Sequence, residues 1–493
     1  MPRVRAPALL IACASALSPG CGESAPPGQG RGVLLIAIDG LRADHLSKWT
    51  GGRDTTSRLI DTLAKRGVSF SRAYSAAPQT IPAHAALLTG CDPYVSKRYR
   101  PQGVEPTAEI LWRIPDPAPR LAREFLRHGY ATAAFCDDPA ISRLQGFSLG
   151  FQTFMAREAG TQEQAGEPAA GVAAVGRELE QWLRQRSRGE SWFAYLHLAD
   201  LERTWRGIDP LRDTYFKPRP ELSSVPPVGD AEHLFFAVPR NRWPGGLRTL
   251  GEYEAQYDGA IRQLDESLHR LLASLVRMGR RESTTVVVTG TYGMGFGEAG
   301  LILDHGTLAD CDLHVPLVIW PSPFVPFEPG ERDALASLID VAPTLLDLEG
   351  LDVPPDMQGV SLARVVRDAR EPSPRSWCFA RAGFQEGIAV IGTEWRYERT
   401  LPWMASTPAL SLSWYGGDPP DPPRAREVLA LLDEHGRPGP DIDPSSEPQV
   451  ARTARTAGFD WIRRVEALRR QLQSREWLHG SAEDPAIDAL LGR

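Results

Sequence analysis

Two aspartates stand just behind apolar runs of the sequence, and this spacing points to metal chemistry. Asp39 follows the run Val33–Ile38, and Asp200 closely follows the run Trp192–Leu198. Such runs are typical of strands that are buried on both faces of a parallel sheet. Ligands bind at the carboxyl ends of these strands, so Asp39 is a metal-ligand candidate. The alternative for Asp39 is a cap for a helix at 41–46.

A hydroxyl side chain begins a second stretch with chemical potential, residues 79–90. Thr80 stands two residues before Pro82, and an apolar run follows directly. Because proline is preferred in the first turn of a helix, we expect Thr80 at a helix N-terminus. Such a terminus is a natural site for an anion. The alternative is that the Thr80 hydroxyl only caps the helix.

Alternating strand and helix patterns between residues 32 and 370 predict the elements that position these side chains. They indicate one α/β domain with a large, mostly parallel sheet sandwiched by helices. Further strands are expected at 131–135, 284–289 and 315–320, and helices at 56–66, 120–128, 172–186, 253–278 and 337–348. Residues 203–247 lack clear periodicity and are interpreted as a long insertion over the rim of the site.

The C-terminal part of the chain predicts a smaller unit. Strand-like alternation over 376–399 indicates a small antiparallel sheet within a β subdomain of residues 371–415. Residues 416–493 are interpreted as a Pro-rich linker and a helical tail, whose amphipathic helix is expected at 451–472.

Composition narrows the class of partner. The chain has 493 residues, of which 42% are hydrophobic, and this allows a sizeable core. Its net charge of −7 argues against nucleic acid as the main partner, because phosphate backbones require clustered positive charge.

The N-terminus predicts export. Arg3 and Arg5 precede an apolar run at 8–17, which is too short to be a stable membrane anchor. Residues 17–21 resemble a bacterial lipobox, which would make Cys21 the lipidated first residue of a mature cell-envelope lipoprotein. Plain signal-peptidase cleavage is the alternative. Residues 22–31 would then serve as a flexible tether.

These motifs, in this order, resemble the sulfatase-like branch of the alkaline phosphatase superfamily over about residues 32 to 400. The opening strand of the family runs into an Asp followed by Leu-Arg-x-Asp-His-Leu, as residues 39–46 do. The family's nucleophile segment, Cys/Ser/Thr-x-Pro-x-Arg/His-x-x-Leu-Leu-Thr-Gly, is matched by residues 80–90. Residues 337–348 and 359–362 look like its downstream signature.

The resemblance implies an activity and a role for each matched residue. The family's alcohol-type nucleophile attacks a sulfate or phosphate ester, and metal cations activate it and neutralise the oxyanion. By this resemblance Thr80 is the nucleophile and a metal-bridging oxygen, and Asp39, Asp200 and His305 are metal ligands. His84 would contact the ester anion or the nucleophile where formylglycine sulfatases carry arginine. Threonine cannot become formylglycine, so the pair looks more like the family's phosphodiesterases.

The chain departs from the family at the metal site. Thr291 and Tyr292 stand where the family carries Asp and His, and Glu202 replaces a family histidine while remaining able to bind a hard cation. Two divalent ions need about six or seven protein donors. Only Asp39 and Thr80 remain for the ion that activates the nucleophile. A divalent metal (Ca, Mg, Zn or Mn) is expected from the family, and the number of ions, including none, stays open.

Two hypotheses follow from these residues. The first is an exported, metal-dependent hydrolase of sulfate or phosphate esters, carried on a small molecule, a glycan or a lipid. The second is a pseudoenzyme that keeps the fold as an envelope-anchored binding or scaffold protein. Family resemblance favours the first hypothesis, and Thr291 and Tyr292 favour the second.

Overall fold

The computed structural model describes most of the chain between residues 30 and 478. The described ranges are 30–50, 56–95, 97–99, 111–157, 171–202, 209–218, 220–226, 228–229, 238–239, 243, 245–298, 301–382, 387–400, 426–432 and 438–478. The predicted export segment with Cys21, and most of the predicted linker, lie outside these ranges. Among the described residues, no helix combines the length and the apolar character needed to cross a bilayer.

An eight-stranded sheet forms the centre of the fold, with the order β14-β2-β13-β10-β1-β7-β5-β6. β1 (Gly32–Ile38) lies between β10 (Thr284–Gly290) and β7 (Trp192–Leu198) and pairs with both in parallel. The remaining strands are β2 (Val68–Tyr74), β5 (Ala131–Cys136), β6 (Thr153–Ala156), β13 (Leu317–Trp320) and β14 (Gly330–Ser337). Only β13 runs antiparallel to its neighbours. This confirms the predicted mostly parallel sheet.

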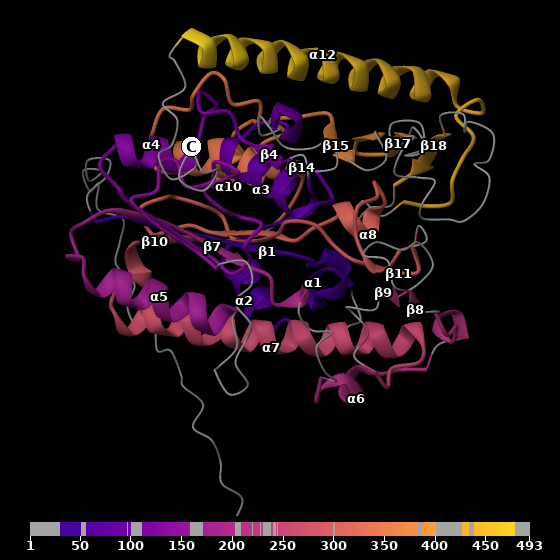
Figure 1. Ribbon diagram of the computed structural model, residues 1–493, viewed down its shortest axis with the longest axis horizontal. Coiled ribbons are helices and arrows are strands. Elements are labelled where there is room, and N and C mark those ends of the chain that lie inside the picture. Colours follow the sequence, from indigo (N-terminus) through magenta and orange to yellow (C-terminus); the bar gives the residue numbers. More distant parts are fainter. Residues whose placement is uncertain are drawn as a thin grey trace, which may run out of the picture.

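Helices cover both faces of this sheet (Figure 1). Val33, Leu35 and Ala37 of β1 pack into one apolar cluster, and the alternate residues of the strand pack into another. The first cluster includes side chains of α3 (Thr80–Thr89), α4 (Leu121–Arg127) and α9 (Val341–Leu348). The second includes α2 (Arg58–Arg66), α5 (Val172–Arg184) and α7 (Leu250–Arg277). Both faces are therefore buried, as the continuous apolar run of β1 requires.

A four-stranded antiparallel sheet lies beside the main sheet and confirms the predicted smaller unit. It contains β15 (Cys378–Ala382), β16 (Gly387–Ile391), β17 (Trp395–Thr400) and β18 (Arg426–Leu431). β18 falls inside the segment that the sequence assigned to linker and tail, so this sheet extends past residue 415. The long helix α12 (Pro448–Leu478) runs along one side of the molecule and contacts β16 and β17 (Figure 1).

The parallel pairing brings chemically active residues to one edge of the main sheet. Asp39 directly follows β1, and its N–H donates to the carbonyl of Leu198 at the end of β7. Thr291 directly follows β10, and its N–H donates to the carbonyl of Ile38. α3 begins near this edge with Thr80, as predicted, and Gln79 is its N-cap.

Candidate functional site

The carboxylate of Asp39 is the centre of a buried cluster at this edge. His84 Nε2 lies 2.8 Å from Asp39 Oδ1, and His197 Nε2 lies 2.9 Å from Oδ2. The Thr291 hydroxyl donates to Oδ1 over 2.5 Å. Asp39 is 1% exposed, and the other three side chains are fully buried. Three different elements, α3, β7 and the loop after β10, therefore direct donors at one carboxylate.

The positions of the protons in this cluster follow from Tyr195. Burial raises the pKa of Tyr195 well above its ordinary value, so the phenol keeps its proton. The phenol hydroxyl is hydrogen-bonded to His84 Nδ1, which must therefore be the acceptor. Burial also lowers the pKa of His84, so this imidazole is neutral at pH 7. A neutral imidazole that accepts at Nδ1 carries its proton on Nε2, and His84 Nε2 donates that proton to Asp39.

Asp39 and His197 form the charged pair of the cluster. Burial alone would raise the pKa of the Asp39 carboxyl, but His197 and His84 outweigh it and hold the pKa well below its ordinary value. Burial alone would lower the pKa of His197, but the Asp39 carboxylate outweighs it and raises the pKa. The result is a carboxylate that accepts three protein donors and is neutralised by one imidazolium.

A divalent ion could bind here only by replacing hydrogen bonds within the cluster, although the donor atoms are close. One ligand atom from each of Asp39, His84 and His197 lies within 4.8 Å of the others. A metal needs the Nε2 lone pairs, so its binding would have to displace the proton on His84 Nε2. A ligating histidine also donates its other N–H to an acceptor. His197 Nδ1 has no hydrogen-bond partner within the part of the chain that the structure describes. The Nε2 atoms of both histidines bond to the Asp39 carboxylate instead.

Thr80, the predicted nucleophile, belongs to a neighbouring group of side chains. It is the first residue of α3 and is half-buried. Its hydroxyl lies 2.8 Å from the hydroxyl of Tyr292, so the observed partner of Thr80 is a phenol. The ring of Tyr292 lies 4.3 Å from the ring of His305, measured between centroids. The Tyr292 side chain therefore lies between Thr80 and His305.

His305 and Glu202 complete this second group. His305 follows the short strand β12 (Ile302–Asp304), and its Nδ1 lies 2.7 Å from the carbonyl oxygen of Pro78. Since a carbonyl only accepts, Nδ1 carries the proton. His305 Nε2 lies 3.9 Å from Glu202 Oε1. Both side chains are half-buried, so this pair lies nearer the surface than the Asp39 cluster.

The structure places the Asp200 carboxylate at the start of α5, whereas the sequence suggested that it binds a metal. Its carboxylate accepts the N–H of Val172, the first residue of α5, with distances of 3.4 and 3.2 Å from Oδ1 and Oδ2. A Cβ at Gly171 would lie 2.2 Å from Asp200 Oδ1, so only glycine fits there. Asp200 thus stabilises the start of α5. The metal-ligand roles of Asp39, Thr80, Asp200, Glu202 and His305 stay predictions.

Sequence reasoning missed three residues of the Asp39 cluster, namely His197, Tyr195 and the hydroxyl of Thr291. His197 and Tyr195 lie in the apolar run of β7 and were assigned to the buried strand as a whole. A histidine inside such a strand was the available signal, because a buried polar side chain needs a partner. Thr291 was noted only as the loss of a family aspartate.

The family model described as Sulfatase matches residues 31–351. A delta 4,5-hexuronate-2-O-sulfatase of Bacteroides thetaiotaomicron is 23% identical over 377 residues, which are 71% of this chain and 75% of that protein.

Two solved structures share the fold. One, in complex with its substrate D-glucosamine-2-N,6-O-disulfate, aligns with a TM-score of 0.62 at 17% identity over 91% of this chain and 98% of that chain. The other, a phosphonate monoester hydrolase of Silicibacter pomeroyi, aligns with a TM-score of 0.60 at 21% identity over 88% and 96%.

Proposed function

Because this chain belongs to the sulfatase family of sulfate ester hydrolases, we propose that it is a non-catalytic member that serves as a binding protein on the sulfatase fold. One observation carries this proposal. The Asp39 carboxylate, at the position where the family holds its metal, accepts hydrogen bonds from His84, His197 and Thr291. Its negative charge is neutralised within the protein.

The family reaction needs two contributions from bound metal, and Thr291 and Tyr292 stand where the family carries two of its metal ligands. A cation must lower the pKa of the nucleophile, and positive charge must stabilise the oxyanion of the transition state. The Thr80 hydroxyl lies 2.8 Å from the Tyr292 hydroxyl, at the position where the family carries a metal-binding histidine. The half-buried carboxylate of Glu202 adds negative charge nearby, which opposes an anionic ester in the absence of a metal.

The proposed ligand class is a sulfated or phosphorylated glycan. Support comes from the relatives, one named for a hexuronate sulfatase activity and one solved with a glucosamine disulfate. We also propose that the protein is exported and held in the cell envelope by a lipid on Cys21, because residues 17–21 resemble a lipobox. Globomycin treatment of expressing cells tests the lipid, since it should cause the lipid-bearing precursor to accumulate.

A second candidate function is hydrolysis with Thr80 as the nucleophile. It is favoured by the position of Thr80 at the start of α3 and by the three donor atoms that lie within 4.8 Å of one another. In that case a metal would displace the proton of His84 and separate Asp39 from His197.

Metal content and turnover distinguish these functions. The purified chain is incubated with Zn, Mn, Mg or Ca, its bound metal is measured by mass spectrometry, and hydrolysis of 4-nitrophenyl sulfate, 4-nitrophenyl phosphate and bis(4-nitrophenyl) phosphate is assayed. We expect no bound ion at Asp39 and the same background rate for wild type and Thr80→Ala. Turnover that is lost both with chelator and in Thr80→Ala would establish the hydrolase instead.

A double variant identifies the cause of the loss. Thr291→Asp with Tyr292→His restores the two family ligands, so it should bind about one ion more per chain than wild type. If the double variant hydrolyses the esters and wild type does not, the loss of turnover is assigned to these two positions. Tyr292→Phe is the control, because it removes the hydroxyl next to Thr80 without adding a ligand.

A further inference from the structure

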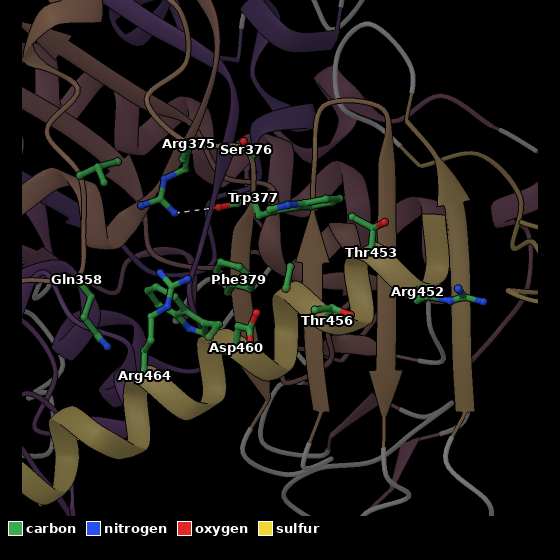
Figure 2. Close-up of a pocket in the computed structure, with 13 residues that line it drawn as sticks. Gln358, Arg375, Ser376, Trp377, Phe379, Arg452, Thr453, Thr456, Asp460 and Arg464 are labelled. Atoms are coloured by element: carbon green, nitrogen blue, oxygen red, sulfur yellow. Dashed lines mark hydrogen bonds between the residues drawn. The ribbon is translucent and has the colours of Figure 1, made fainter. Parts of the chain in front are cut away.

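A separate pocket lies between α12 and the antiparallel sheet (Figure 2). It encloses about 660 Å³, within the range of sites for small-molecule ligands. Gln358 lines it, and the N–H of this residue donates to the carbonyl of Gly90, just past the C-terminal end of α3. Thr80 begins the same helix, so the length of α3, about 15 Å, separates the pocket from the sheet edge.

Aromatic rings form one wall of the pocket. Trp377 and Phe379 are half-buried and line it from the sheet side. Phe379 stacks on Trp461 of α12 with ring centroids 4.7 Å apart and an interplanar angle of 6°. The Trp461 indole N–H donates to Asp92 Oδ2 over 2.7 Å, which fixes the ring. These flat, immobile faces suit a ligand with a flat apolar face.

The charged groups of the pocket leave an excess of positive charge. Asp460 is paired with Arg463, and Arg375 is paired with the buried Asp340. Arg464 lines the pocket from α12 and is exposed, and it has no acidic partner within the residues that the structure describes. An unpaired guanidinium on a chain with a net charge of −7 is a site for a carboxylate, sulfate or phosphate, which it binds with two hydrogen bonds.

Arg375 also lines the pocket, but the protein uses its guanidinium. It pairs with the buried Asp340 and donates to the carbonyl of Trp377 over 3.1 Å. Its side chain is only 8% exposed, so it fixes the wall of the pocket. Figure 2 shows Arg375 bonded to the backbone of Trp377, and Arg464 on the α12 side of the pocket. Arg464 is therefore the guanidinium that remains available to an oxyanion.

Hydroxyl groups line the remaining wall. Ser376, Thr453 and Thr456 are exposed and line the pocket. Hydroxyls and the Gln358 amide both donate and accept, which matches a ligand that carries hydroxyl groups. From these three features we infer that the pocket binds a sugar that bears an oxyanion, with its ring against Trp377 and Phe379 and its charge on Arg464. This inference holds whether or not Thr80 is catalytic.

Calorimetric titration of the full chain tests the inference. The probes are D-glucosamine 6-sulfate, D-glucosamine 6-phosphate, D-glucuronate, D-glucose and inorganic sulfate. We expect at least one charged sugar to bind at least tenfold more tightly than D-glucose and than inorganic sulfate. The rank of the three charged sugars identifies the oxyanion. Equal binding of all five probes, or none at all, would overturn the inference.

Two arginines of the same helix provide the matched variants. Arg464→Gln should weaken the tightest sugar at least tenfold, whereas Arg470→Gln, which removes an exposed charge outside the pocket, should leave binding unchanged. Equal effects of both variants would contradict the pocket. Thr80→Ala separates the two sites: binding that is lost in Thr80→Ala but kept in Arg464→Gln would place the sugar at the sheet edge. Circular dichroism confirms that each variant is folded.

Discussion

The sheet edge and the pocket beneath α12 differ in whether their charged side chains have partners within the protein. At the sheet edge, Asp39 is surrounded by protein donors and paired with His197, and nothing in the cluster faces water. In the pocket, Arg464 is exposed and no acidic partner lies among the described residues. Charges that a fold neutralises itself are not available to a ligand, whereas charges left unpaired on a cavity wall are available. The comparison therefore moves the binding function away from the position where the family does its chemistry.

Asp39→Asn should give the largest effect, because it breaks the buried pair and leaves the His197 imidazolium without a counter-charge. Removal of one partner of a buried ion pair costs about 3–5 kcal/mol of unfolding free energy. Urea denaturation followed by tryptophan fluorescence measures it. Asp368→Asn, at an exposed pair with Arg370, should leave the midpoint unchanged. Similar midpoints for the two variants would show that the Asp39 cluster is not the structural unit described here.

Asp312→Asn sharpens the contrast with a buried carboxylate that has hydrogen bonds but no paired cation. Its Oδ2 accepts the N–H groups of Gly306 and Thr307 and the Thr307 hydroxyl. Burial raises the pKa of Asp312 to about 8 despite these bonds. The folded state then holds a proton that the unfolded state releases above about pH 4, so stability falls as the pH rises towards 8, by at most about 1.4 kcal/mol per pH unit.

The amide of Asp312→Asn does not titrate, so this part of the pH dependence should disappear. Urea midpoints of wild type and variant, measured at pH 5, 6, 7 and 8, give the two slopes. Parallel slopes would mean that Asp312 is ionised throughout this range, which would make it resemble Asp39 after all.

Trp461→Phe tests how firmly α12 is held over the pocket. The variant keeps a ring to stack on Phe379 but removes the N–H that reaches Asp92. A buried acceptor that loses a donor costs about 1–3 kcal/mol of unfolding free energy. Thermal denaturation measures the loss. Phe459→Leu, at an exposed position of the same helix, should change the melting temperature much less.

Arg464→Gln should have the smallest effect on stability, within about 0.5 kcal/mol, because its charge is exposed. Together with the expected loss of sugar binding, this would separate function from stability at that position. A destabilisation as large as that of Asp39→Asn would instead assign Arg464 a structural role and remove the contrast between the two regions.

The sequence by itself determined the framework of the site. Apolar runs specified the buried strands β1 and β7, since strands covered on both faces are largely apolar, and β-branched residues specified β10. The same patterns placed Asp39 after β1 and Thr80 at the start of α3. β14 was not predicted, because its first half is charged and it lies at the edge of the sheet, where one side is exposed.

Only the tertiary structure decided which side chains meet. β1 lies between β10 and β7, so Thr291 and His197 reach Asp39 although they are 252 and 158 residues away in the sequence. The contact of Asp200 with the start of α5, 28 residues away in the sequence, likewise came only from the structure. The pocket required α12 to lie across a sheet whose last strand had no predicted boundary. Periodicity fixes how each segment buries its own apolar face, whereas the partner of a polar group depends on which segments become neighbours in space.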